Sequence, residues 1–279
     1  MTKPIIYVTL ILGISCHHGK QRTVAQRAPD NVNADVYSTI ADIPAPSGYK
    51  RVPVDKGSFA EWLRGIRLKA DSKVYLYNGS PRVDQSTQYA VLDLPIGNKD
   101  LQQCADAIMR LRAEYFFAAN RLDSIELTSI DGANLSFVRW LNGERYKIDR
   151  GRLHSFIATK SAVDRPSQLQ QFLDVVFSYC STISLEKQTR FVDDLQHVMP
   201  GDMLIKAGSP GHAMIVVDTA VDPSGKILVL LAQGFMPAQS IHIVKNLTVM
   251  DINPWYSIET GRVITTPHWT FYKNQLKRW

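Results

Sequence analysis

Three side chains in this sequence have the types that thiol-based hydrolysis needs: Cys104, His212 and Gln233. Cys104 falls in the first turn of an expected helix, where the partial positive charge of the helix N-terminus lowers the pKa of a thiol. His212 starts an apolar strand pattern and offers an imidazole that can exchange a proton with the thiol. Gln233 ends the next expected strand and can orient that imidazole. These residues predict a nucleophile, a general base and an orienting residue.

An antiparallel hairpin must bring His212 and Gln233 together. The apolar patterns HAMIVVD, which starts at His212, and KILVLLAQ, which ends at Gln233, are separated by the turn sequence DPSG over residues 222–225. A hairpin centred on residues 223 and 224 leaves Gln233 two positions away from direct pairing with His212. We therefore expect both side chains at the same end of one sheet.

A long amphipathic helix must position the cysteine. Residues 100–120 read DLQQCADAIMRLRAEYFFAAN, with Asp100 as the expected N-cap and Gln103, three positions later, completing a capping-box pattern. One face of this helix is apolar at helical spacing and comprises Leu101, Cys104, Ala105, Ile108, Leu111 and Tyr115. The helix is thus expected to present Cys104 near its N-terminus and beside the core.

The remaining patterns predict an α+β protein, because the long helix comes first and an antiparallel meander follows. The composition, 45% hydrophobic and 21% charged residues, excludes a disordered chain. Helices are expected over 59–68, where Ser58 supplies the N-cap, over 169–179 and over 185–191. Strands are expected over 74–77, 88–94, 125–130, 136–148, 203–206, 212–218, 226–233 and 241–244, and near Trp269.

The segment 200–233, PGDMLIKAGSPGHAMIVVDTAVDPSGKILVLLAQ, resembles the second half of the papain-like cell-wall hydrolases of the NlpC/P60 and CHAP groups. Their pattern is Pro-Gly-Asp, a strand, Gly-His opening an apolar strand, a turn, and a strand that ends in a polar residue. CHAP members often carry Gln before the cysteine, as in Gln103-Cys104. The resemblance implies a papain-like helix plus an antiparallel β-meander or barrel. It also implies Cys104 as nucleophile, His212 as base, Gln233 as orienting residue, and Gln103 on the oxyanion or substrate side.

Two departures from this pattern bear on the expected architecture. The interval between Cys104 and His212 is longer than in compact members, so residues 121–199 are expected to be an insertion. The aspartate or asparagine and the serine that flank the NlpC/P60 cysteine are absent. The whole chain also resembles a family of bacterial lipoproteins that is defined only as a domain of unknown function, through stretches such as LQQCADAIMRLRAEY and GSPGHAMIVVD. This second resemblance implies a lipoprotein but no established activity.

The first residues predict an export signal. Residues 1–15 combine Lys3 with a largely apolar run of about ten residues, which is too short to cross a bilayer as a mature helix. The sequence GISC over 13–16 resembles a bacterial lipobox, so Cys16 is the expected lipidation site; a plain signal peptide cut elsewhere and a buried N-terminal strand are the alternatives. We expect a signal peptide over 1–15, a lipid-anchored tether over 16–40 and one elaborated domain over 41–279, exported to the cell envelope.

Other classes of function lack their sequence signals. The formal net charge is +6, but no cluster of Lys and Arg marks a nucleic-acid surface. Metal-ligand spacing, a P-loop and a dinucleotide-binding fingerprint are all absent from the sequence, so neither a metal nor a cofactor is expected. Cys180 follows an apolar helical pattern and is expected to pack in the core, with a Cys104–Cys180 disulfide as the open alternative.

Three hypotheses for function remain at this point. The first is a membrane-anchored cysteine hydrolase, an amidase or endopeptidase, that acts on cell-wall peptide or amide bonds. The second is a non-catalytic surface lipoprotein that binds glycan or peptide in the same groove, and the third is a structural or assembly lipoprotein. Cys104, His212 and Gln233 also have purely structural interpretations, as a packed cysteine, a hydrogen-bonded turn residue and a polar strand end. Their arrangement in space separates these alternatives.

Overall fold

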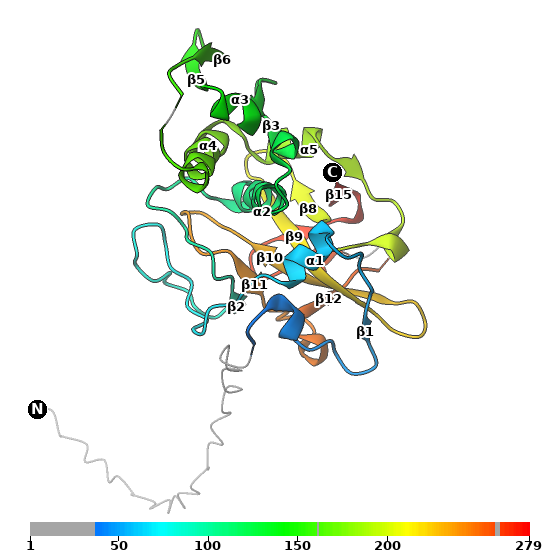
Figure 1. Ribbon diagram of the computed structural model, residues 1–279. Helices are drawn as coiled ribbons and strands as arrows, with labels where there is room; N and C mark the ends of the chain where they lie inside the picture. Colours follow the sequence, from blue (N-terminus) through cyan, green and yellow to red (C-terminus); the bar gives the residue numbers. More distant parts are fainter. Residues whose placement is uncertain (1–36, 161, 260–262) are drawn as a thin grey trace, which may run out of the picture. The chain divides into compact units, whose positions relative to one another are not determined.

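The computed structural model describes residues 37–160, 162–259 and 263–279, and within them it is a mixed α+β protein, as the sequence predicts (Figure 1). Its largest sheet has nine strands in this described part, in the order β2-β11-β10-β9-β8-β15-β7, with β1 beside β9 and β12 beside β10. All its pairings are antiparallel. These strands are β1 (Lys50–Arg51), β2 (Gln88–Val91), β7 (Arg190–Phe191), β8 (Met203–Lys206), β9 (His212–Val221), β10 (Ile227–Gln233), β11 (His242–Val244), β12 (Trp255–Ser257) and β15 (Leu276–Arg278).

Helices cover one face of this sheet. The α-helices of the described residues are α1 (Phe59–Arg64), α2 (Cys104–Ala118), α3 (Phe137–Leu141), α4 (Arg165–Tyr179) and α5 (Thr182–Lys187). Helices α1 and α2 lie against β9, and α4 and α5 lie beside α2 (Figure 1). Three small hairpins complete the fold: β3 (Glu126–Thr128) with β4 (Asn134–Ser136), β5 (Glu144–Asp149) with β6 (Arg152–Ile157), and β13 (Ile264–Thr265) with β14 (Thr270–Phe271).

The central strands are buried on both faces, which explains their unbroken apolar runs. On one face, Ala213 and Ile215 of β9 pack in the same hydrophobic cluster as Ile108 of α2. On the other face, Met214 belongs to a second cluster together with Phe271 of β14. Because side chains alternate along a strand, His212 lies on the same face of β9 as Met214.

A register shift in the β9–β10 hairpin decides which side chains share a face. Near the turn Leu230 pairs with Asp218, but the next residue, Leu231, pairs with Val216, so β9 carries a one-residue bulge. A shift of one residue moves a side chain to the other face of a sheet. The bulge therefore puts Gln233 on the face that His212 occupies. The hairpin centre predicted from the sequence gives the wrong pairing near the turn and the right pairing at the Gln233 end.

Helix α2 begins at Cys104, later than the N-cap predicted at Asp100. Gln103 is the N-cap, and Asp106 accepts a hydrogen bond of 2.9 Å from the backbone N–H of Gln103. The Asp100 carboxylate instead accepts a hydrogen bond of 2.7 Å from the backbone N–H of Ala238, between β10 and β11. The segment before α2 is thus tied to the sheet, and Cys104 becomes the first residue of the helix.

The region 121–199 packs into the same core as α2. Its helices α3 and α4 contribute Phe137 and Phe172, whose ring centroids lie 5.5 Å apart within the cluster that holds Ile108. The strand predicted over 136–148 is wrong in its first part, because residues 137–141 form α3. Phe137 and Trp140 are buried one helical turn apart, which is a helical spacing rather than a strand alternation.

Other predicted boundaries shift by a few residues or fail. The helix predicted over 59–68 ends at Arg64, with the Ser58 hydroxyl accepting from the Glu61 N–H as expected, and the helix predicted over 185–191 is α5 at 182–187. The helix predicted over 169–179 starts earlier, at Arg165. The strand predicted over 74–77 is replaced by isolated bridges at Tyr75 and Leu76. The strand over 203–206 is confirmed as β8.

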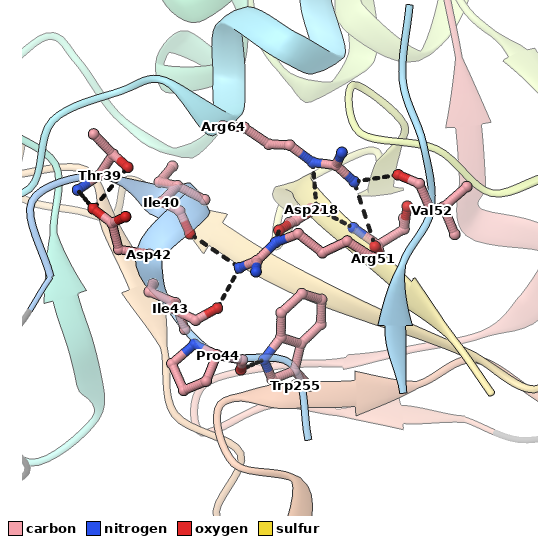
Figure 2. Close-up of polar contacts among 11 residues, drawn as sticks. Thr39, Ile40, Asp42, Ile43, Pro44, Arg51, Val52, Arg64, Asp218 and Trp255 are labelled. Carbon is pink, nitrogen blue, oxygen red and sulfur yellow. Dashed lines mark hydrogen bonds and ion pairs between the residues drawn. The ribbon is translucent and has the colours of Figure 1, made fainter. Parts of the chain in front are cut away.

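A buried charge cluster ties the first described residues to β9 (Figure 2). The fully buried carboxylate of Asp218 accepts hydrogen bonds from Nε of Arg51 and Nε of Arg64, each at 2.6 Å. Arg64 also donates to the carbonyl of Val52 at 2.8 Å. Removing one partner from a buried ion pair costs about 3–5 kcal/mol. The cluster therefore holds β1 and α1 on the sheet, which gives Asp218 a structural role.

Candidate functional site

A pocket of about 500 Å³ lies where α2 and β9 begin. Its lining includes Gln103, Cys104 and His212. Gln233 is 1% exposed and hydrogen-bonds to His212. The chain thus brings the four residues predicted for catalysis and for the oxyanion or substrate side into one region. Other parts of the wall come from the loop 208–211, from the start of α5 and from the aromatic side chains Phe177, Phe235 and Trp269.

Cys104 lies beside the backbone that joins His212 to Ala213. The Ala213 backbone N–H is hydrogen-bonded to the thiol. Burial raises the pKa of the Cys104 thiol, the hydrogen bond from Ala213 opposes that rise, and the nearby Asp106 carboxyl adds to it. The effect of burial therefore outweighs the lowering of this pKa that we expect from the helix N-terminus.

The His212 imidazole is held by Gln233 and by aromatic rings. Its Nε2 lies 2.7 Å from Oε1 of Gln233. The ring centroids of Phe235, Trp269 and Phe271 lie 5.2, 5.5 and 5.9 Å from that of His212. Burial lowers the pKa of His212 to about 4, although the hydrogen bond to Gln233 acts in the opposite direction. At neutral pH the imidazole is therefore uncharged.

Cys104 and His212 both line this pocket, and no hydrogen bond joins the thiol to the imidazole in the described structure. With a raised thiol pKa and a lowered imidazole pKa, both groups rest in their neutral forms. Hydrogen bonds between catalytic groups are often long before a substrate binds and tighten in the complex. The arrangement suits proton transfer during attack rather than a preformed thiolate–imidazolium pair.

Two glycines let the elements of the site approach closely. A Cβ atom on Gly234, just after Gln233, lies 2.7 Å from the carbonyl oxygen of Gln103. A Cβ atom on Gly211, just before His212, lies 2.4 Å from the carbonyl oxygen of Gly208. Both separations are too short for a side chain. Glycine at 234 allows the end of β10 to meet the start of α2, and glycine at 211 allows the tight turn that leads into β9.

Asp106 is a buried carboxyl in the pocket wall that sequence reasoning missed. One oxygen accepts the hydrogen bond from Gln103, whereas Oδ1 has no partner among the described residues. Burial raises the pKa of Asp106 to about 8, and the hydrogen bond from the Gln103 backbone opposes that rise. The sequence signal was its place three positions after Gln103, which is the N3 position of a capping box.

Cys180 lines the same pocket but is not paired with Cys104. Both described cysteines are free, so the alternative of a disulfide between them is wrong for this structure. The Cys180 thiol is buried and donates to the carbonyl of Thr128 at 3.4 Å. Burial raises the pKa of Cys180 to about 12, with the Asp106 carboxyl as the next cause. Cys180 is therefore the less reactive thiol.

His242 is a second missed residue. It lies directly opposite Gln233 in the β10–β11 pairing, is fully buried, and its Nε2 is 3.2 Å from Nε2 of Gln233. The sequence places it in the strand predicted over 241–244 but carries no signal for a role at the site. In the described residues no group of three or more His, Cys, Asp and Glu side chains is arranged to hold a metal ion.

A larger pocket of about 660 Å³ lies between the chain near Val52 and the C-terminal strand β15. Arg112 and Trp279 line it, with the guanidinium carbon of Arg112 at 4.2 Å from the centroid of the Trp279 ring. This pocket contains none of the predicted site residues.

Comparison with known proteins identifies a family. Residues 40–278 match the family described as Domain of unknown function (4846), and the chain therefore belongs to that family. The curated proteins and the solved structures gave no match. Cys16 and the predicted signal lie outside the described residues, and within the described ranges no helix is long and apolar enough to span a membrane.

Proposed function

We propose that this member of the family of domain of unknown function 4846 is a papain-like cysteine hydrolase, an amidase or endopeptidase. The observation that carries the proposal is the hydrogen bond of 2.7 Å between Nε2 of His212 and Oε1 of Gln233, behind a pocket that Cys104 also lines. A nucleophile at a helix start, an imidazole at a strand start and an amide that orients it are the parts that thiol hydrolysis requires.

The first half of the reaction forms a thioester. The thiol proton of Cys104 moves to the free ring nitrogen of His212 while sulfur attacks the carbonyl carbon of the substrate amide. The oxyanion is stabilised by donors at the start of α2. The Gln103 N–H is already occupied by Asp106, so we assign the Cys104 N–H and the Gln103 side-chain amide as donors to the oxyanion. The imidazolium then protonates the leaving amine as the C–N bond breaks.

The second half of the reaction releases the acid. Water attacks the thioester carbon and gives one proton to His212, and the C–S bond breaks as the sulfur regains that proton. Cys104 and His212 are uncharged at the start and at the end of each half-reaction, with the sulfur acylated between the two halves, which agrees with the raised thiol pKa and the lowered imidazole pKa. A neutral resting pair predicts that the free enzyme depends on bound substrate to align its groups.

The proposed substrates are peptide or amide bonds of the cell wall. Support comes from the predicted export signal, the lipobox-like sequence that ends at Cys16, and the resemblance of 200–233 to cell-wall hydrolases. On this proposal a lipid on Cys16 anchors the chain at a membrane of the cell envelope. The aromatic side chains Phe235 and Trp269 offer apolar walls for a peptide or a sugar ring.

Incubation of the purified protein with soluble cell-wall fragments tests this function. We expect new amine termini in the fragments and, after acid quenching, an acyl adduct on the peptide that contains Cys104. Cys104→Ser should abolish both signals, whereas Cys180→Ser serves as the matched control and should keep both. Binding of the fragments without cleavage, unchanged in Cys104→Ser, contradicts the hydrolase and supports a glycan- or peptide-binding protein.

A further inference from the structure

A row of three polar side chains crosses the sheet, starting at His212 in the wall of the pocket that Cys104 also lines. His212 on β9, Gln233 on β10 and His242 on β11 occupy one face of three neighbouring strands. They are 2%, 1% and 0% exposed, so each polar atom must be satisfied within the protein. Three contacts link the row: His212 Nε2 to Gln233 Oε1 at 2.7 Å, Gln233 Nε2 to His242 Nε2 at 3.2 Å, and His242 Nδ1 to the carbonyl oxygen of Ser240 at 2.9 Å.

The carbonyl of Ser240 fixes the direction of every hydrogen bond in this row. A backbone carbonyl can only accept, so Nδ1 of His242 carries the proton and donates. In a neutral imidazole the other nitrogen is then an acceptor, so Nε2 of His242 must accept from the amide NH₂ of Gln233. This leaves the amide oxygen of Gln233 facing His212, where it can only accept. Nε2 of His212 must therefore donate.

We propose that His242 is a positioning residue: through Gln233 it holds the proton of His212 on Nε2 and leaves Nδ1 free to take the proton of Cys104. The amide of Gln233 alone cannot hold the proton on Nε2 of His212. If the side-chain amide rotates by half a turn, it presents its NH₂ to His212 and favours the opposite tautomer. His242 removes that alternative, since NH₂ must face its acceptor nitrogen. This inference rests on the proposed function for its catalytic meaning, but the proton positions stand on the hydrogen bonds alone.

The surroundings keep His242 neutral, as the row requires. Burial lowers the pKa of His242 to about 3, while its hydrogen bond to Ser240 acts in the opposite direction. The charged or titratable groups around it are Arg82, His268 and His212, and each of them also lowers the pKa of His242. The row therefore keeps one protonation pattern over the neutral pH range.

Two-bond ¹H–¹⁵N correlation spectra of the full-length protein at neutral pH test the proposal. The signals of His212 and His242 are assigned by their absence from His212→Gln and His242→Gln. We expect opposite tautomers, Nε2–H for His212 and Nδ1–H for His242. An Nδ1–H tautomer of His212 in the unsubstituted protein overturns the proposal.

Variants of His242 then test whether the tautomer of His212 depends on His242. His242→Phe removes the acceptor, so His212 should populate both tautomers and the alkylation rate of Cys104 by iodoacetamide should fall about 10-fold. His242→Gln offers an amide oxygen to Gln233 and should restore the Nε2–H tautomer and most of the rate. His268→Phe, a nearby histidine outside the row, is the control and should leave the tautomer unchanged.

A pure Nε2–H tautomer in His242→Phe overturns the proposal. If the tautomers behave as expected while cell-wall fragments are not cleaved, the proposed function fails and the proton assignment stands.

Discussion

At the scale of single residues, the site combines the proposed nucleophile with a buried acid. Cys104 and Asp106 lie in the first turn of α2 and both line the pocket. The carboxyl of Asp106 is nearly fully buried and one of its oxygens lacks a partner in the described structure, so its charged form is disfavoured. At neutral pH it is largely protonated, which limits its repulsion of a developing thiolate. A neutral Asp106 is thus compatible with thiol chemistry two residues away.

Asp106→Asn should stabilise the protein increasingly as the pH rises from about 4 to about 8. The pKa of Asp106 is raised from 3.8 to about 8, so the folded state holds a proton that the unfolded state has lost throughout that range. The unsubstituted protein therefore loses stability as the pH rises, whereas asparagine keeps the shape and the acceptor for Gln103 without titrating. One pKa unit corresponds to about 1.4 kcal/mol, and we expect a gain of at least about 2 kcal/mol at pH 8.

Urea unfolding of both proteins at several pH values measures this difference. The gain should be small near pH 4 and level off above about pH 8. Asp174→Asn, a substitution in the surface pair with Lys99, is the control and should shift stability by about 1 kcal/mol or less. A gain for Asp106→Asn that does not change with pH contradicts the assigned pKa.

Residue types and local patterns predict the residues proposed for catalysis but not the residue proposed to position them. Cys104, His212 and Gln233 stand out in the sequence because each falls at the end of a periodic segment. His242 does not stand out, because its role depends on direct pairing with Gln233, a contact between strands that a single sequence does not specify. The pKa of Cys104 was predicted in the wrong direction, since burial depends on packing that the helix pattern alone does not reveal.

At the scale of elements, the site depends on three ends that meet: the start of α2, the start of β9 and the end of β10. The bulge in β9 turns Gln233 to the face of His212, and Gly234 lets β10 touch α2. The apolar runs of β9 and β10 predict the strands but not the bulge, because both faces are buried and the pattern contains no alternation. The start of α2 was predicted too early, because Asp100 bonds to Ala238, which is distant in sequence.

Gly234→Ala should push the end of β10 and the start of α2 apart. The new methyl group lies 2.7 Å from the carbonyl oxygen of Gln103, so either α2 or β10 must move. Overpacking of this kind typically costs about 1–3 kcal/mol. We expect a lower unfolding temperature together with slower alkylation of Cys104, because the thiol moves relative to His212.

The matched control is Gly65→Ala. A Cβ atom there meets its nearest neighbour, the carbonyl oxygen of Trp62, at 3.5 Å, which is an ordinary contact. Thermal unfolding and the alkylation rate should both stay close to those of the unsubstituted protein. An unchanged unfolding temperature and alkylation rate in Gly234→Ala refute the idea that this close approach positions the site.

At the scale of the whole molecule, distant segments converge on one sheet. The Asp218 cluster joins β1 and α1 to β9 from the start of the described chain, while α3 and α4 extend the same core from the region 121–199. The α+β class follows from the order of helical and strand patterns. The strand order β2-β11-β10-β9-β8-β15-β7 does not follow from it, because pairings such as β8 with β15 join residues far apart in sequence.

Thiol alkylation of the full-length protein tests the partnership of Cys104 and His212 most directly. Iodoacetamide should modify Cys104 at neutral pH at least about 10-fold faster than Cys180, because in the proposed mechanism His212 accepts the Cys104 proton, whereas Cys180 is buried with a pKa of about 12. His212→Gln, which keeps much of the side-chain volume, should slow modification of Cys104 by about 10-fold or more and leave Cys180 unchanged. Equal rates at Cys104 with and without His212 would show that the two side chains do not act together.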